Sequence, residues 1–215
     1  FRYASDLKNA AKPDEALKVY DRIESIEGIS DTLQRSRIVI YTAKNDILGE
    51  ENALKALERA FPDNITYSER LGDFYVRTNQ PQKAMEIFSV MSKRNPLMVT
   101  PHLKLAANYS AQGENEKAFS EIVKAFEIPL ASALEEKMAI MHSVYPSNDN
   151  APTLSPAKRK EVDSLTRILR RVHPDKAAPY SISGNYYYKD GKFIEAREMY
   201  HKASALGQDE YEPWK

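Results

Sequence analysis

A repeat period of about 34 residues is the feature that most restricts how this chain can fold, because a fixed period of this length indicates stacked copies of one supersecondary unit. In four segments an alanine is followed four positions later by a larger apolar or aromatic residue, and after three more positions by another apolar residue. The segments are Ala16 with Tyr20 and Ile23, Ala84 with Phe88 and Met91, Ala118 with Ile122 and Ala125, and Ala196 with Tyr200 and Ala203. Ala84 and Ala118 are one such period apart, and Ala16 precedes Ala84 by two periods.

A second pattern recurs before three of these alanines, Ala84, Ala118 and Ala196. It consists of a pair of residues whose second member is glycine or alanine, with a tyrosine three positions after that small residue. The instances are Leu71-Gly72 with Tyr75, Leu105-Ala106 with Tyr109, and Ser183-Gly184 with Tyr187. This spacing predicts a first helix whose inner face carries Leu and Tyr, with the small residue allowing a second helix to approach closely. Pro62, Pro96 and Pro174 fall where each unit should end, because proline cannot continue a helix.

The two patterns together resemble the tetratricopeptide repeat (TPR) family, and the segment 184–196 is the closest match. The resemblance covers nearly the whole chain. It implies an all-α fold, specifically a right-handed superhelical α-solenoid of helix-turn-helix repeats. One such hairpin cannot bury its apolar face alone, so the repeats must stack.

The pattern divides residues 1–215 into one array of unequal repeats. We expect a truncated repeat at 1–29, a divergent one at 30–63, regular ones at 64–97 and 98–130, an expanded one at 131–175, another at 176–209, and the start of a seventh at 210–215. In the second repeat, Ala53 and Leu57 suggest a frame shifted by about three residues. In the fifth, the proline-rich insertion 146–156 predicts a loop before a helix from Ala157 to Val172. The start without methionine, inside a helical pattern, predicts a piece of a longer protein.

Composition excludes several classes of function. The 31 basic and 31 acidic residues balance, so the overall basic field of most nucleic-acid binders is missing. There is no cysteine, which excludes disulfides and thiolate chemistry. No apolar run approaches the roughly 20 residues of a membrane span. We therefore expect no nucleic-acid partner and no transmembrane segment.

The sequence contains no constellation that indicates catalysis. The tripeptide His173-Pro174-Asp175 resembles that of J-domain co-chaperones, but Pro174 also fits the repeat end. The four histidines lack the spacing of metal ligands, and no nucleophile motif or phosphate-binding loop is present. The run from Lys158 to Lys160 could bind an anion or be a solvated helix turn, and Tyr186 to Tyr188 could stack bases or pack in the core. We predict no enzyme activity, no cofactor and no metal.

Binding residues follow from the resemblance. In TPR proteins the first helices line a concave groove, and positions beyond the core Leu and Tyr point into it. Carried onto this chain, these positions are Glu69, Asp73, Val76, Arg77, Leu103, Ala107, Ser110, Lys137, Met141, Val144, Ser181, Asn185 and Tyr188. Charge lies at one end, apolar residues in the middle, and polar and aromatic residues at the other end. The Lys–Asn arrangement that grips a C-terminal carboxylate is missing in the third and fourth repeats.

The sequence therefore predicts a non-enzymatic scaffold that binds a peptide or partner helix in the groove or associates through the ends of the array. The alternative is a sensor or regulatory TPR module whose activity lies elsewhere in a larger protein. The segment 173–214 also resembles long TPR proteins of bacterial cell envelopes, which implies an envelope or periplasmic location, with the cytoplasm as the alternative.

Overall fold

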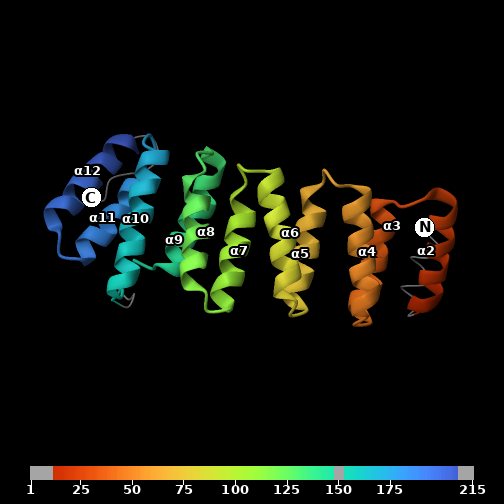
Figure 1. Ribbon diagram of the computed structural model, residues 1–215. Coiled ribbons are helices and arrows are strands. Elements are labelled where there is room, and N and C mark those ends of the chain that lie inside the picture. Colours follow the sequence, from red (N-terminus) through yellow and green to blue (C-terminus); the bar gives the residue numbers. More distant parts are fainter. Residues whose placement is uncertain (1–11, 148–152, 208–215) are drawn as a thin grey trace. The chain divides into compact units, whose positions relative to one another are not determined.

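The computed structural model describes residues 12–147 and 153–207, and all regular structure within these residues is helical. This confirms the predicted all-α class. The helices, labelled as in Figure 1, are α2 Pro13–Glu27, α3 Asp31–Ala43, α4 Ile47–Ala60, α5 Ile65–Arg77, α6 Pro81–Arg94, α7 Val99–Ala111, α8 Asn115–Glu127, the 3-10 turn η1 Ala131–Ala133, α9 Leu134–Val144, α10 Pro156–Val172, α11 Ala177–Lys189 and α12 Phe193–Leu206. None of these helices is long and apolar enough to cross a membrane.

Consecutive helices pair as hairpins, which are α3–α4, α5–α6, α7–α8 and α11–α12 (Figure 1). Side chains fix several helix starts, since Ser30, Asp46, Asn64 and Ser155 each accept a hydrogen bond from a backbone N–H of the first turn. The hairpins therefore begin where local chemistry favours a helix start, as the pattern of the sequence requires.

The helix starts keep the repeat period strictly in three consecutive repeats. The first helices α3, α5 and α7 begin at Asp31, Ile65 and Val99, so each start lies one full period after the previous one. The second helices α4, α6 and α8 follow the same rule. The shift expected for the second repeat is therefore wrong: Glu50, not Ala53, stands one period before Ala84.

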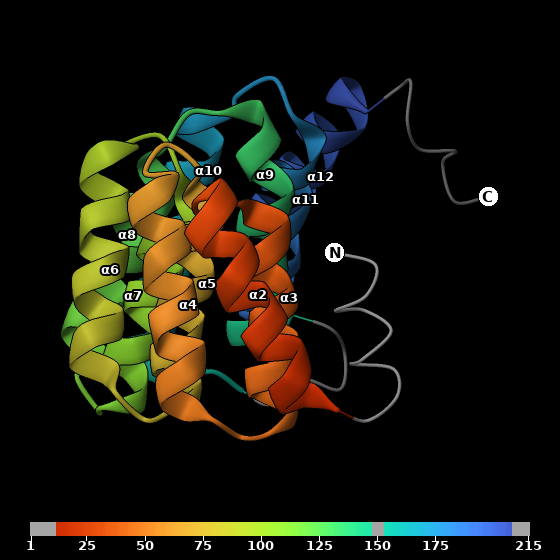
Figure 2. The ribbon, with the colours of Figure 1, turned by 90° about the vertical axis from the view of Figure 1, so that its right-hand side faces the viewer.

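The chain divides into two compact units, the first ending at Arg94 and the second beginning at Asn95. In unit 1, α3 lies beside α2 (Figure 2) and also contacts α4, and Ala16, Tyr20, Leu33 and Ile40 form a buried cluster. In unit 2, a larger buried cluster joins α8, α9, α10 and α11. Its largest members are Phe126, Met141, Tyr145, Leu165, Leu169, Ile182 and Tyr186. The expected single array over residues 1–215 stays a prediction.

Glycines set the closeness of three hairpins. A Cβ atom built on Gly72 would lie 2.4 Å from the Phe88 ring, and one on Gly184 would lie 2.5 Å from the Tyr200 ring. The second repeat reverses this arrangement, because the glycine is on the second helix: a Cβ atom built on Gly49 of α4 would lie 2.4 Å from the Tyr41 ring of α3. The first helix of this repeat has no Leu-Gly pair, and the close approach of the two helices is made possible by a glycine on the second helix instead.

Replacing Gly72 with alanine should destabilise unit 1 by about 1–2 kcal/mol. The gain in helix propensity, about 0.5–1 kcal/mol, is smaller than the cost of overpacking, because the fully buried Phe88 ring cannot move aside. The equivalent positions in the next repeat are Ala106 and Ile122. Gly72→Ala combined with Phe88→Ile recreates that pair. Urea unfolding should show the double variant more stable than the sum of the two single changes, and simple additivity would contradict the packing.

The fifth repeat departs from the others. Its second helix, α10, makes its main backbone contacts with α8 and α11 rather than with α9. The described residues between α9 and α10, 145–147 and 153–155, are not helical, which agrees with the predicted loop. Residues 148–152 of the insertion, residues 1–11 and the expected seventh repeat at 210–215 lie outside the described residues. Thr153 and Leu154, which follow residues 148–152, line a hollow of about 180 Å³ together with residues of α10 and α11. An ion pair between Arg159 of α10 and Asp190, directly after α11, joins these two helices at 2.9 Å.

Candidate peptide-binding grooves

Unit 2 contains an apolar groove of about 180 Å³, here called the unit 2 groove. Four of the predicted binding residues, Leu103, Ala107, Ser110 and Val144, line it together. The rest of its lining comes from α7, α8, α9 and α10: Ala106, Asn115, Ala118, Phe119, Ile122, Ile140, Tyr145, Lys158 and Glu161. Candidates predicted from separate repeats therefore meet in one depression.

Two charged residues of α10, Lys158 and Glu161, line the unit 2 groove. Lys158 Nζ lies 4.9 Å from the centre of the Tyr145 ring and 2.7 Å from a Glu161 carboxylate oxygen. The Tyr145 hydroxyl donates to the same oxygen of Glu161 at 2.8 Å. Burial is the main cause that raises the pKa of Tyr145. The groove thus combines apolar walls with a fixed, paired set of polar groups.

Unit 1 contains a wider groove of about 570 Å³, here called the unit 1 groove. The predicted residues Asp73 and Arg77 line it, whereas Glu69 and Val76 do not, although Val76 is exposed on α5. Its other lining residues are Ile38, Val39, Thr42, Ala43, Glu50, Leu54, Arg70 and Phe74. It therefore combines exposed apolar surface on α3 with charged groups from α4 and α5.

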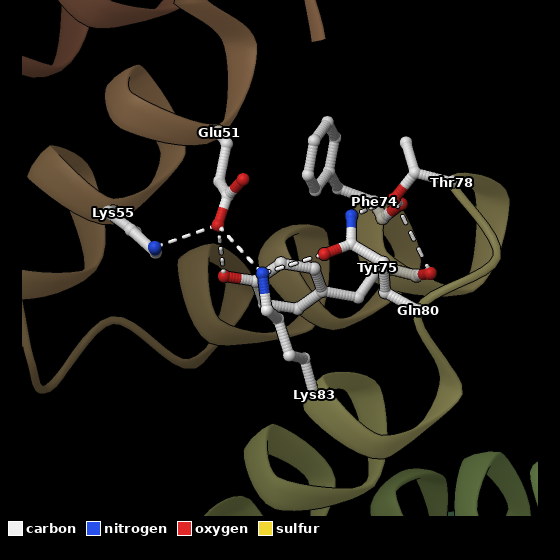
Figure 3. A network of polar contacts seen from close by, with 7 residues as sticks. All are labelled: Glu51, Lys55, Phe74, Tyr75, Thr78, Gln80 and Lys83. Atoms are coloured by element: carbon white, nitrogen blue, oxygen red, sulfur yellow. Dashed lines mark hydrogen bonds and ion pairs between the residues drawn. The ribbon is translucent and has the colours of Figure 1, made fainter. Parts of the chain in front are cut away.

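A polar network centred on Glu51 joins the three helices α4, α5 and α6 (Figure 3). One Glu51 carboxylate oxygen accepts a hydrogen bond from the Tyr75 hydroxyl at 3.0 Å and pairs with Lys55 at 2.7 Å and Lys83 at 3.5 Å. The hydrogen bond from Lys55 is the largest cause that lowers the pKa of Glu51. The network therefore joins α4 to α5 and α6 at the residue next to Glu50.

Two predicted groove residues, Lys137 and Met141, are fully buried, so their assignment is wrong. The repeat period would place Ala139 and Ser143 in the core slots of Leu105 and Tyr109. Met141 and Tyr145, also one helical turn apart, bury far more apolar surface than an alanine and a serine do. The helix α9 therefore turns its Lys137–Met141–Tyr145 stripe inward, and the strict period fails in this helix.

Lys137 occupies a buried polar pocket of unit 2. Its amino group donates to the carbonyl oxygens of Phe126, at 3.1 Å, and Ile128, at the end of α8. It also lies 3.0 Å from Nε2 of His173, the residue that ends α10. Burial lowers the pKa of Lys137 to about 8 and, together with the nearby Lys137 charge, lowers the pKa of His173. Lys137 thus joins the ends of two helices rather than facing a ligand.

The burial of His173 also decides between the two interpretations of the His173-Pro174-Asp175 tripeptide. His173 is 3% exposed and bonded to Lys137, so it takes part in packing rather than presenting a surface motif. Nδ1 of His102 lies 2.7 Å from a carboxylate oxygen of Glu121. Within the described residues, no three His, Asp or Glu side chains gather as a metal site would require.

The candidates of the sixth repeat do not join either groove. Asn185 Oδ1 accepts a hydrogen bond from the Tyr200 hydroxyl at 2.8 Å, while Ser181 is half-buried on α11. Tyr188 is 57% exposed and packs edge-on against Phe193, with ring centres 5.5 Å apart. These three residues lie on the first helix of their repeat, as predicted, and none of them lines the unit 1 groove or the unit 2 groove.

Sequence reasoning missed Glu50, which lines the unit 1 groove although it is 5% exposed. A signal was present. Ala16 and Ala84 are two periods apart, and Glu50 stands at the position midway between them. A strict frame would have marked it as a carboxylate in a slot where the neighbouring repeats place a buried alanine.

The regular spacing of helix hairpins, with glycines at their close contacts, defines the chain as a tetratricopeptide-like helical repeat protein. The family model described as PPR repeat matches residues 72–96, which is one turn-and-helix segment of α5 and α6. A match of this length does not place the whole chain in that family. None of the curated proteins matches the sequence.

Solved structures of helical repeat proteins are similar to this chain at low identity. MamA from Desulfovibrio magneticus RS-1 is 12% identical, covering 98% of this chain and 94% of that chain at a TM-score of 0.44. YrrB, described as a TPR protein with an unusual peptide-binding site, is 17% identical, covering 97% and 85% at 0.43. A tetratricopeptide repeat protein from Parabacteroides merdae ATCC 43184 is 16% identical, covering 96% and 77% at 0.45. Values this low assign neither a partner nor a function to the chain.

Proposed function

We propose that the chain is a non-enzymatic protein-binding scaffold whose unit 2 groove receives an apolar side chain of a peptide or partner helix. The observation that carries this proposal is the convergence of apolar side chains from α7, α8 and α9 on one open depression. Leu103, Phe119 and Ile140 are each partly exposed there. A partner that covered them would gain hydrophobic stabilisation without first unfolding the repeat.

The volume of the groove favours a single side chain as its occupant. Pockets for cofactors and other small molecules typically measure about 300–1,000 Å³. An apolar cavity of about 150 Å³ is large enough for benzene. The unit 2 groove, at about 180 Å³, is therefore sized for one leucine or aromatic side chain. A peptide would bind by placing such an anchor in the groove and laying its flanking residues along α7 and α9.

The backbone of the groove walls supports recognition through side chains. Its walls are helical, so most of the backbone N–H and C=O groups are already paired within α7, α8, α9 and α10. A peptide could not bind here as an added β-strand, because that mode requires the unpaired backbone groups of an exposed sheet edge. The Lys158–Glu161 pair at the groove gives a partner one place for a polar contact beside the apolar anchor.

The test is a charge placed on the groove wall. Ala107→Glu should weaken binding of an apolar anchor at least tenfold, because docking would desolvate the new carboxylate. Ala139→Glu is the matched control, since Ala139 is exposed on the first helix of the next repeat and does not line the groove. Both changes leave the core untouched, which circular dichroism would verify.

The probe is a phage-displayed library of heptapeptides selected on the immobilised parent chain. Enriched peptides that share one large apolar residue and bind the parent and Ala139→Glu, but not Ala107→Glu, would support the proposal. Equal binding to all three chains would place the contact elsewhere. Failure to enrich any sequence would show that the groove does not recognise short peptides.

A further inference from the structure

The unit 1 groove contains a buried carboxylate where the neighbouring repeats have alanine. Ala16, Ala84 and Ala118 are buried at equivalent positions, at 0%, 0% and 6% exposure. Glu50, one repeat period from both Ala16 and Ala84, is 5% exposed. A methyl group there costs nothing to bury, whereas a carboxylate must be desolvated. Glu50 is therefore an exception that packing of the repeat does not require.

One oxygen of this carboxylate has a partner and the other does not. Oε1 accepts a hydrogen bond from the Arg77 guanidinium at 2.6 Å. Oε2 is buried and has no hydrogen-bond partner among the described residues. Buried side-chain oxygens in native proteins are almost always paired, so an unpaired one indicates a missing donor. Of the buried unpaired atoms in the described part of the chain, only this one belongs to a residue that lines the unit 1 groove or the unit 2 groove.

The charges of the unit 1 groove indicate what kind of donor is missing. Glu50 and Asp73 contribute two negative charges to its lining, and Arg70 and Arg77 contribute two positive ones. A cationic donor would add a repulsive charge beside the Arg77 guanidinium, which already pairs with Glu50. An anion would be repelled by the Glu50 carboxylate. The balance favours a donor without charge, such as an amide N–H.

The remaining walls of the groove are suited to apolar neighbours of that donor. Val39 is 55% exposed and lies beside Ile38 on α3, and Phe74 and Leu54 form the facing wall. Arg77 is about half exposed whereas Glu50 is buried, so the guanidinium lies on the solvent side of this ion pair. A ligand that approaches between α3 and α5 would meet apolar surface first and the Glu50 carboxylate at its inner end.

We propose that the unit 1 groove is a second peptide-binding site, in which an uncharged N–H donor between apolar residues, such as a glutamine or asparagine carboxamide, bonds to the unpaired oxygen of Glu50. This site does not depend on the unit 2 groove, because its lining comes from other helices. The donor would turn a desolvated oxygen into one with a charge-assisted hydrogen bond.

Pools of capped heptapeptides test this site. Each pool has mixed valine and leucine flanks and one fixed central residue: glutamine, asparagine, norleucine, lysine or glutamate. On the immobilised full chain, the glutamine or asparagine pool should be retained about tenfold better than the norleucine pool. The lysine and glutamate pools should not exceed norleucine.

Two variants assign the preference to Glu50. In Glu50→Gln the negative charge is lost at constant size, so the hydrogen bond is no longer charge-assisted and the carboxamide preference should fall from about tenfold to about threefold or less. Glu58→Gln is the matched control, because Glu58 is a half-buried glutamate on the same helix outside the groove. Val39→Glu, an exposed change on α3, should weaken all pools without affecting the fold, which covers the case that Glu50→Gln is unstable.

The outcomes separate the alternatives. A carboxamide preference that keeps its full size in Glu50→Gln, or the absence of any preference in the parent chain, would overturn the proposal, and an ordered water would then be the partner of the unpaired oxygen. A preference for lysine would overturn the charge argument. Ala107→Glu, in the unit 2 groove, should leave the carboxamide preference unchanged, so failure of one site is distinguishable from failure of the other.

Discussion

Met141→Glu is expected to unfold unit 2 or to destabilise it by roughly 4 kcal/mol or more, which is a large share of the roughly 5–15 kcal/mol that stabilises a typical domain. Met141 is fully buried in the cluster that joins α8, α9, α10 and α11. A carboxylate there would lose its water without gaining a partner of opposite charge. Urea unfolding followed by circular dichroism measures the loss, and hydrogen exchange localises it to unit 2.

The control for this prediction is Met141→Leu, which conserves volume and apolar character and should change stability by less than about 1.5 kcal/mol. A surface position for Met141, as the repeat period alone suggests, would make Met141→Glu nearly neutral instead. A stable, fully helical Met141→Glu chain would therefore contradict the inward rotation of α9.

Lys137→Met is expected to destabilise unit 2 by about 2 kcal/mol at pH 7, because the carbonyl oxygens of Phe126 and Ile128 lose their donor. The loss should increase with pH. The pKa of Lys137 is lowered from 10.5 to about 8, so between these values the unfolded chain binds more protons than the folded one. The stability of the parent chain therefore rises with pH in this window, by up to about 3 kcal/mol, and the variant lacks this gain.

The measurement is urea unfolding at several pH values from 7 to 9.5. Above about pH 10 the tyrosines reverse the trend, because burial raises the pKa of Tyr145 and Tyr186 in the folded chain. Lys124→Met is the control, since Lys124 lies on the exposed side of α8 and pairs with Glu121. Parallel pH curves for the parent and Lys137→Met would mean that Lys137 keeps an ordinary pKa.

Much of the fold could be predicted because repeated local chemistry specifies it. The Leu-Gly and Ala patterns, with proline at the repeat ends, predict helix hairpins, and the structure places hairpins at α5–α6, α7–α8 and α11–α12. The close contact of Gly72 with Phe88 confirms the reason given for the small residue. The insertion before α10 was also predictable, because three prolines among polar residues cannot continue a helix.

The binding candidates were predictable only where the period holds on a regular pair of helices. Leu103, Ala107 and Ser110 meet Val144 in the unit 2 groove. The assignments of Lys137 and Met141 failed because the inward face of a helix is decided by which stripe buries the most apolar surface, not by the number of residues since the previous repeat. The sequence carried a warning, since the slots of Leu105 and Tyr109 are filled by Ala139 and Ser143.

By itself, the sequence determined the class of fold, the helix hairpins and the exclusion of cysteine and disulfide chemistry, since these depend on local propensity, spacing and composition. Only the tertiary structure decided which way α9 faces, which helices α10 packs against, and that Glu50 lies buried with one oxygen unpaired. The physical reason is that burial is settled by competition among all the surfaces that can pack together. A sequence pattern records the local preferences of a helix, but not the outcome of that competition.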